Sequence, residues 1–250
     1  MFSELTDRSS LQVERLVAST RELSGQLDAL SFSAPVTHVY NPLDYAFEPF
    51  RRYVEAYGGG KKSFVILGMN PGPWGMAQTG VPFGEIEAVE DWLAINAAVG
   101  QPRQLHPKRP ITGFATTRRE VSGQRVWGWA KERFGTPAAF FGVGFVLNYC
   151  PLLFFDEDGT NITPDKLKTH DRAALFQCCD RAFSQQVELL GASVVIALGR
   201  FAFDRASQAL AGSDVSVLTA PHPSPANPAA NAGWFGLMDS VFRTAFPNLP

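Results

Sequence analysis

The chain has little cysteine and no long apolar run. Its 250 residues include three cysteines, Cys150, Cys178 and Cys179, and none stands in the C-x-x-C spacing of zinc or iron–sulfur sites. We therefore expect no disulfide framework, no metal and a reducing compartment. No run of about 18 apolar residues occurs, and charged side chains stand near the start of the chain, so we expect a soluble protein that is not secreted.

A strong net charge of either sign is also absent. Lys and Arg total 22 and Asp and Glu total 24, which gives a formal net charge of −2. Any binding to nucleic acid therefore has to come from a local patch. Two groups of basic residues could line a phosphate track, although simple surface solvation explains them equally well. They are Arg51, Arg52, Lys61 and Lys62, and Arg103, Lys108, Arg109, Arg118 and Arg119.

The hydrophobic content of 45% is enough for one substantial core, and we expect one domain over residues 1–250. Four short runs rich in β-branched or aromatic residues lack alternation, which predicts strands buried on both faces. These runs are Phe64–Gly68, Gly144–Asn148, Val194–Leu198 and Val215–Thr219. Helical patterns occur at Glu85–Ala97, Trp127–Phe134, Asp171–Leu190, Arg200–Leu210 and Ala232–Phe246. Strands that alternate with helices predict an α/β fold with a parallel sheet covered on both sides.

The start of the chain predicts an amphipathic helix. Leucines recur at helical spacing at positions 11, 16, 23, 27 and 30, so we expect a helix within residues 1–35 that docks on the core. Residues 99–126 and 155–170 are polar and weakly periodic, and we expect them to form long loops packed over the domain. Loops of this length in a compact domain are usually functional or disordered.

Polar loops follow three of the four predicted strands, at residues 69–84, 148–153 and 220–231. Ligands of parallel sheets gather beyond the carboxyl ends of the strands. The first loop is rich in glycine and proline, which gives a stiff backbone that a ligand can approach closely. It lacks the Lys and Ser/Thr of a phosphate-binding P-loop. A tight turn without any ligand would have the same composition.

Three polar residues stand at these strand ends. Asn70 could position a water molecule, Asn148 could read a heterocycle that carries a donor beside an acceptor, and His222 could act as an acid or electrostatic catalyst. A lone Asn in a turn is more often structural, and His222 taken singly could equally be a turn residue, but the three residues together at strand ends favour a function. The pair Asn227-Pro228 predicts the N-cap and first turn of the last helix.

Three motifs carry a resemblance to a known family. The stretches "GMNPGPWGMAQTGVPFGE", "NYCPLLF" and "HPSPANPAAN" resemble the single-strand-selective monofunctional uracil-DNA glycosylase family. The similarity runs from about Leu43 to the last helix and includes "HPKRPITG", "EVSGQRVWGW" and "NITPDKL". It implies the uracil-DNA glycosylase fold, a three-layer α/β/α arrangement around a central four-stranded parallel sheet.

The resemblance also implies an activity, the hydrolysis of the N-glycosidic bond of uracil and of some oxidised uracils in DNA. The base would be flipped into a pocket, because its reacting atoms are hidden in the stack. Phe83 would stack on the base, Asn148 would pair with its polar edge, and Met69 and Gly72 would contact it. Gly72 stands where a classical relative has a bulky aromatic residue, which leaves room for a water molecule or a 5-hydroxymethyl group.

The same resemblance assigns the chemistry. Asn70 would place the attacking water, and His222 would support the departing base. The loop Ser224, Pro225, Ala226, Asn227 and Pro228 would contact DNA, and Ala226 replaces an Arg that relatives often carry, which weakens the expected wedge into the duplex. No lysine stands in the three motifs, so we expect no Schiff base with the sugar and no strand nicking. We also expect no cofactor. A monomer would suffice for this activity. We expect the protein in the cytoplasm if the organism is a bacterium and in the nucleus if it is a eukaryote.

Other functions fit the same residues. A pocket lined by glycine need not exclude a larger ring, so the substrate could be a deaminated purine such as xanthine or hypoxanthine. A panel of damaged-base oligonucleotides would test this alternative. A binder of single-stranded or abasic DNA could keep the fold without turnover. An unrelated α/β enzyme would act on a small nucleoside or phosphate ester, and cleavage of free deoxyuridine would identify it.

Overall fold

The computed structural model describes the backbone of residues 2–249 and the side chains of residues 9–249. The α-helices are α1 Phe2–Asp28, α2 Pro42–Tyr45, α3 Phe47–Tyr57, α4 Met76–Thr79, α5 Val121–Phe134, α6 Pro137–Phe141, α7 Thr169–Leu190, α8 Arg200–Ala209 and α9 Pro228–Ala245. The strands are β1 His38–Tyr40, β2 Phe64–Gly68, β3 Gly144–Asn148, β4 Leu153–Phe155, β5 Asn161–Ile162, β6 Val194–Leu198 and β7 Ser216–Ala220. Short π- or 3-10-helical turns lie at Ala88–Trp92, Gly113–Ala115 and Pro164–Lys166.

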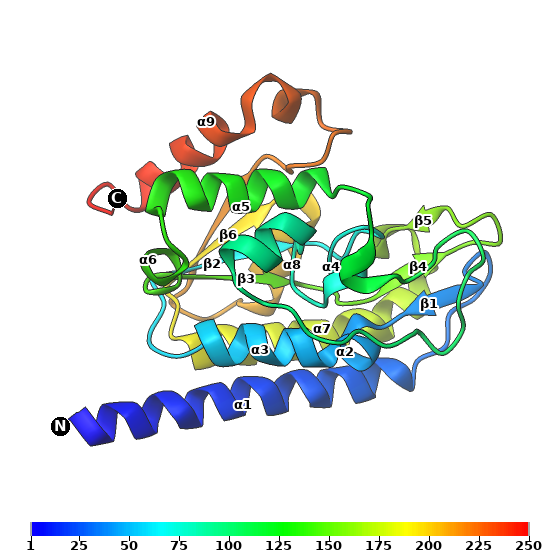
Figure 1. The fold of residues 1–250 in the computed structure, drawn as a ribbon, viewed down its shortest axis with the longest axis horizontal. Coiled ribbons are helices and arrows are strands. Elements are labelled where there is room, and N and C mark those ends of the chain that lie inside the picture. Colours follow the sequence, from blue (N-terminus) through cyan, green and yellow to red (C-terminus); the bar gives the residue numbers. More distant parts are fainter. Residues whose placement is uncertain (1, 250) are drawn as a thin grey trace.

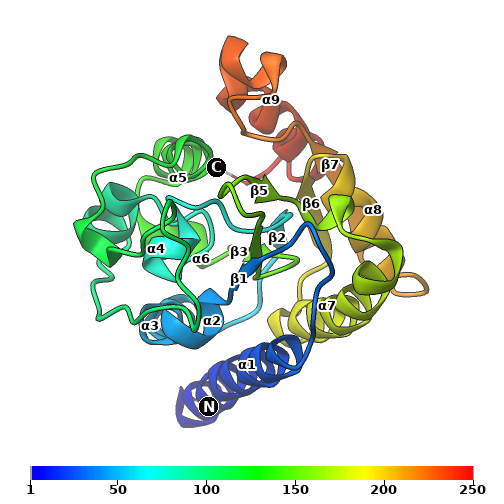
Figure 2. The same cartoon turned by 90° about the vertical axis from the view of Figure 1, so that its right-hand side faces the viewer.

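The centre of the molecule is a four-stranded sheet in the order β3-β2-β6-β7, and every neighbouring pair is parallel. All five residues of β2 are buried, as the absence of alternation in its sequence predicts. The helices between β2 and β3 lie on one side of the sheet, and α7 and α8 lie on the other, as Figure 2 shows. Figure 1 shows α9 beside α5, on the side of the sheet away from α1. The predicted three-layer α/β/α fold with a four-stranded parallel sheet is confirmed.

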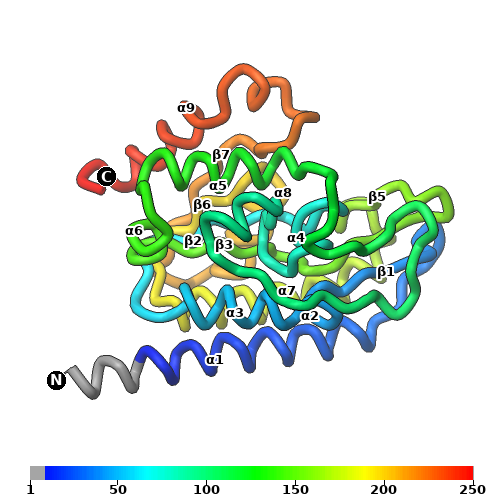
Figure 3. Tube along the Cα trace, in the orientation of Figure 1, coloured from blue at the N-terminus to red at the C-terminus, as the bar shows by residue number. Residues whose placement is uncertain are grey.

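The leading helix α1 packs along α7 and α3. Its apolar stripe buries Leu16, Leu23 and Leu27, whereas Leu11 has 54% of its surface exposed. Leu30 follows the end of the helix at Asp28. Figure 3 shows that the coloured part of α1 begins on the same side of the molecule as the end of α9, away from β5. No helix within residues 2–249 is both long and apolar enough to cross a membrane.

Two expectations about local structure are wrong. The helix predicted at Glu85–Ala97 shrinks to a turn that ends at Trp92, and the backbone then bends at Ala94, which has a φ of 52°. The loop predicted at residues 155–170 contains β5, part of a second sheet with the antiparallel order β1-β4-β5. Strands of two or three residues show no periodicity of their own, and they form here because distant segments pair with one another.

Tyr53 on α3 completes the edge of the central sheet. Its hydroxyl donates to the carbonyl of Val146 in β3 at 3.0 Å and accepts from the Val146 N–H at 3.2 Å. Tyr53 is fully buried, and β3 is an edge strand. Because Val146 turns both backbone groups away from β2, this one hydroxyl supplies the partner that an edge strand lacks. The contact holds the strand that ends at Asn148.

Replacement of this tyrosine tests the contact. Tyr53→Phe leaves a buried N–H and a buried carbonyl without partners, so we expect the free energy of unfolding to fall by about 1–3 kcal/mol in urea titration. Tyr57→Phe is the control, because Tyr57 is partly buried and donates one bond, to the carbonyl of Leu93. Equal losses in the two variants would show that β3 does not depend on this contact.

Candidate active site

A cavity of about 380 Å³ lies at the carboxyl ends of the central strands. The loop after β2 contributes Met69, Asn70 and Gly72, β3 contributes Asn148, and the loop after β7 contributes His222. Phe83, Ser224 and Pro225 also line it. Eight of the eleven residues predicted for the site therefore meet in one cavity, the remaining three being Ala226, Asn227 and Pro228 just beyond it.

Asn70 follows β2 by two residues, and its amide is oriented by the backbone. The side-chain N–H group donates to the carbonyl of Leu152 at 3.2 Å and, less favourably, to that of Pro71 at 3.4 Å. Within the described chain, nothing donates to its side-chain oxygen. Asn70 therefore offers a fixed acceptor to the cavity, which is the geometry needed to hold a water molecule.

His222 has its tautomer fixed by the loop that carries it. The Ser224 N–H donates to the Nδ1 atom of the ring at 3.0 Å, so Nδ1 is an acceptor and the ring proton stands on Nε2. Burial lowers the pKa of His222 from its ordinary value of 6.5. The ring is therefore neutral at physiological pH and presents Nε2–H as a donor to the cavity. Gly199, at the start of α8, leaves space for the His222 side chain, since a Cβ at position 199 would lie 3.2 Å from the His222 Cβ.

Phe83 has an unusual backbone that sets its ring against the sheet. Its φ is 53°, a left-handed conformation that costs of order 1–3 kcal/mol for a residue other than glycine. The Phe83 carbonyl accepts bonds from the indole N–H of Trp127 at 3.0 Å and from the Glu85 N–H at 2.7 Å, which hold that conformation. The ring then lies over Gly68, where a Cβ would be 2.5 Å from its Cζ atom.

Asn148 lies beside Phe83 at the end of β3. Among the residues that the structure describes, its side-chain N–H group donates only to the sulfur of Met76, at 3.3 Å. Its side-chain oxygen is buried and accepts no hydrogen bond from the described residues. An unpaired buried acceptor costs about 1–3 kcal/mol. The cavity therefore contains a carboxamide with unused capacity for pairing.

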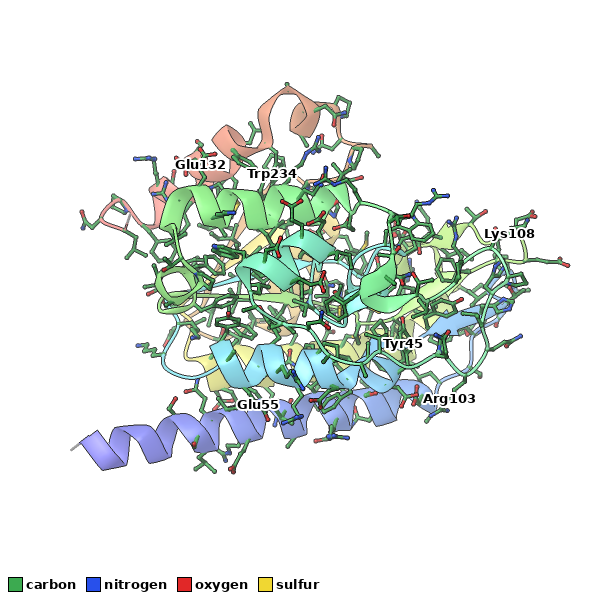
Figure 4. All side chains as sticks on the ribbon, viewed as in Figure 1. Tyr45, Glu55, Arg103, Lys108, Glu132 and Trp234 are labelled. Atoms are coloured by element: carbon green, nitrogen blue, oxygen red, sulfur yellow. The ribbon has the colours of Figure 1, made fainter. Side chains whose placement is uncertain are left out.

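The loop between β7 and α9 is held from several sides. The side chain of Asn227 caps α9 through the Ala229 N–H and donates to the His222 carbonyl at 2.9 Å, which confirms its predicted place at the helix start. The Trp234 indole donates to the Pro221 carbonyl at 2.7 Å. Figure 4 labels Trp234, which lies beneath the first turns of α9. Hydrogen bonds to the backbone of His222 and of the residue before it therefore hold His222 in position.

Arg125 of α5 also binds this loop. Its guanidinium donates to the Pro223 carbonyl at 2.7 Å and to the Asn231 side chain at 2.9 Å. Asn231 in turn donates to the Pro225 carbonyl at 2.9 Å. Pro225, Ala226 and Pro228 are exposed at the tip, so the loop presents a small rigid apolar edge to solvent.

The cavity also contains residues that the sequence analysis does not place there, among them Glu120, Ser122, Asn161 and Thr163. Glu120 caps α5 through the Gly123 N–H, and burial together with the Glu85 carboxylate raises its pKa. These residues come from the segments predicted to be long loops, which are typically functional, and from motifs that carry the resemblance. Loop length and the motifs therefore indicate these segments, but they do not indicate which of their residues enter the cavity.

The predicted basic groups are mostly used elsewhere. Lys62 is buried, donates to the carbonyls of Gly59 and Phe141, and has a pKa lowered by burial to about 8, so it is no part of a phosphate track. Arg51 and Arg52 pair with Glu48 on α3. Across residues 9–249, no three or more His, Cys, Asp or Glu side chains cluster as metal ligands would.

Comparison with known proteins gives the family. The model of the Uracil DNA glycosylase superfamily matches residues 56–245, and the chain belongs to this superfamily. A protein of Rattus norvegicus named single-strand selective monofunctional uracil-DNA glycosylase is 50% identical over 214 residues, 85% of this chain and 77% of the relative. Proteins of Mus musculus and Bos taurus with the same name are each 49% identical over 214 residues, 85% of this chain and 77% and 79% of the relatives. The resemblance predicted from the motifs is confirmed.

A solved structure supports the fold independently. The crystal structure of wild-type Pedobacter heparinus SMUG2 superposes with a TM-score of 0.64 and covers 92% of this chain and 97% of its own. The two sequences are 16% identical, so the likeness concerns the fold alone.

The state of His222 can be measured directly. We expect nitrogen NMR to show the Nε2–H tautomer and a pKa below 6.5 in the folded protein, with the urea-unfolded chain as reference. Because folding favours the neutral ring, the stability that it contributes is complete above pH 6.5 and is lost as the pH falls through the lower folded-state pKa. A proton on Nδ1, or a folded pKa at or above 6.5, would contradict the geometry.

Proposed function

We propose that this chain removes uracil from DNA by hydrolysis of the N-glycosidic bond, with Asn70 and His222 as its catalytic residues. The observation that carries the proposal is their placement. One cavity brings together an oriented acceptor on Asn70, a neutral Nε2–H donor on His222, the aromatic ring of Phe83 and the unpaired amide of Asn148. Relatives that are about half identical over most of the chain are named for the same activity.

The cavity fits a pyrimidine better than a sugar or a phosphate. Phe83 offers a flat surface on which a flipped base stacks, and Asn148 offers a donor and an acceptor side by side. Uracil presents an N–H next to a carbonyl, which is the complementary pair. Binding would therefore satisfy the Asn148 oxygen, which accepts no hydrogen bond from the described residues.

The two catalytic residues act on opposite sides of the bond that breaks. Asn70 has no useful basicity, because an amide does not accept a proton near neutral pH. It holds the water for attack on a sugar that already carries positive charge, and the proton that the water loses as its oxygen bonds to the sugar passes to the departing base anion or to solvent. Negative charge develops on the leaving base, and the His222 Nε2–H stabilises it at the O2 oxygen. A neutral donor that is already in place needs no reorganisation as the charge forms.

The product is an intact strand with an abasic site. Strand cleavage by a lyase needs an amine that forms a Schiff base with the sugar, and no lysine is among the described residues that line the cavity. We propose that the monomer is the active form. We place the activity where chromosomal DNA lies, in the bacterial cytoplasm or the eukaryotic nucleus.

The cavity also has room beside Gly72 for a substituent at position 5 of the pyrimidine. The nearest atom to a Cβ at Gly72 would be the Glu120 Oε1, at 3.6 Å. Oxidised uracils such as 5-hydroxymethyluracil therefore belong to the proposed substrates. Their hydroxyl group would lie near the polar atoms of Glu120.

The roles of Asn70 and His222 are tested on a labelled oligonucleotide with one uracil, single-stranded or opposite guanine. We expect the wild type to yield cleaved strands only after alkali treatment. His222→Ala should lose about a hundredfold or more in single-turnover rate, because one preorganised donor contributes about 2.7–4 kcal/mol to the barrier. Asn70→Ala should also be severely impaired, because the water loses its acceptor.

Two exposed residues of the same types serve as controls. His170→Ala and Asn96→Ala lie outside the cavity and should keep the wild-type rate. Full activity in Asn70→Ala or His222→Ala would remove the role assigned to that residue. A wild type that leaves uracil in place but releases xanthine or hypoxanthine would move the substrate to a deaminated purine.

The Gly72 position is tested by a single methyl group. Gly72→Ala fits the protein, since its Cβ meets nothing closer than 3.6 Å, but it narrows the cavity. We expect the ratio of kcat/KM for 5-hydroxymethyluracil to that for uracil to fall by about tenfold or more. Gly25→Ala adds the same group where nothing lies within 4 Å and should leave the ratio unchanged. An unaltered ratio in Gly72→Ala would place the 5-substituent elsewhere.

A further inference from the structure

Trp74 differs from every other tryptophan of the chain. Trp92, Trp127, Trp129 and Trp234 all pack in or against the main core, and each indole N–H donates a hydrogen bond. Trp74 belongs to neither buried cluster, and its indole N–H has no partner among the described residues. A large aromatic side chain without a packing role is more typical of a binding surface than of a core.

Two guanidinium groups lie against this indole. The central carbon of Arg118 is 4.9 Å from the centre of the Trp74 ring, and that of Arg109 is 5.9 Å from it. Arg109 also lies 5.8 Å from the ring of Phe155, which is fully buried, so the row of side chains that solvent can reach consists of Arg118, Trp74 and Arg109. Alternating aromatic rings and guanidinium groups are the components of surfaces that bind single-stranded nucleic acid.

The charges of these two arginines are not neutralised by acidic side chains. Arg109 donates to the Gly159 carbonyl at 2.6 Å, and neither it nor Arg118 pairs with a carboxylate in the described part of the chain. Their basic neighbours do have such partners: Arg103 pairs with Asp28, Arg119 with Glu87, and Lys108 with Asp158. Lys108 is labelled at the outer edge of the molecule in Figure 4. Free positive charge is therefore concentrated at Trp74.

The row of side chains borders the active-site cavity. Gly72, two residues before Trp74, lines the cavity, and so does Glu120, two residues after Arg118. Asn161, which pairs with Phe155 across the β4–β5 hairpin, lines it as well. The loop with Ser224 and Pro225 contributes a further part of the lining, so a strand with one nucleotide in the cavity has to continue over these borders.

We propose that Trp74, Arg118 and Arg109 form a second nucleotide site, which stacks a base of single-stranded DNA next to the flipped one and binds its phosphate. This inference rests on the proposed action on DNA, and it adds the path that the DNA strand takes beyond the active-site cavity. A flanking base in a duplex is already stacked and paired, so it has to leave the helix before it reaches Trp74. The site therefore favours single strands over duplexes.

The test measures binding separately from excision. The probe is a fluorescent ten-residue oligothymidine without uracil, single-stranded or annealed to oligoadenine, and the readout is fluorescence anisotropy. Trp74→Ala should weaken single-strand binding about tenfold and duplex binding less than twofold, because one base–aromatic stack is lost. Trp74→Phe keeps an aromatic surface and should restore most of the single-strand affinity.

Arg118→Gln gives a second variant that does not depend on the indole. It should weaken single-strand binding and lower the slope of log affinity against log salt by about one. Arg119→Gln is the matched control, because Arg119 is next in the chain and already paired with Glu87, and it should behave as wild type. Thermal unfolding of each variant shows whether it is folded.

Two results would overturn the proposal. One is wild-type single-strand affinity in Trp74→Ala and in Arg118→Gln, and the other is an equal loss for single strands and duplexes in both. Failure of the proposed catalysis gives a different pattern. A wild type that leaves uracil in place would refute glycosylase action, while a Trp74-dependent affinity for oligothymidine would still establish the second site.

Discussion

The close approach of β2 and β3 at their carboxyl ends is the constraint on which the site depends. Gly68 pairs with Asn148 in the parallel register, and a Cβ on Gly68 would lie 2.4 Å from the Asn148 side-chain oxygen and 2.5 Å from the Phe83 ring. The missing side chain is what allows an aromatic ring and a carboxamide to share the end of the sheet. The unusual backbone of Phe83 and the position of Asn148 both follow from that space.

The opposite side of the cavity is built by hydrogen bonds rather than by close packing. Bonds from Ser224, Asn227 and Trp234 hold the loop that carries His222, and Arg125 reaches it from α5. The backbone sets the tautomer of His222, and burial keeps the ring neutral. A site of this kind works through placement and electrostatics. It needs no strong base, which agrees with the role that we propose for the Asn70 amide in holding the water.

The basic residues divide into those that the fold pairs with acceptors and those that we propose bind DNA. Lys62 donates hydrogen bonds to backbone carbonyls, and Arg51, Arg52 and Arg103 form ion pairs with carboxylates. Arg109 and Arg118 remain beside Trp74, on the border of the cavity. In a chain with a net charge of −2, such a local concentration supplies the attraction that a global field does not.

The sequence by itself determined the parallel sheet, the family and the residues at the strand ends, because burial on both faces and contiguous motifs are local patterns. Only the tertiary structure decided that Glu120 and Asn161 enter the cavity, that His222 carries its proton on Nε2, and that β1, β4 and β5 form a sheet. It also decided which of the described arginines form no ion pair with a carboxylate. These features depend on contacts between segments far apart in the chain, and no local periodicity encodes such contacts.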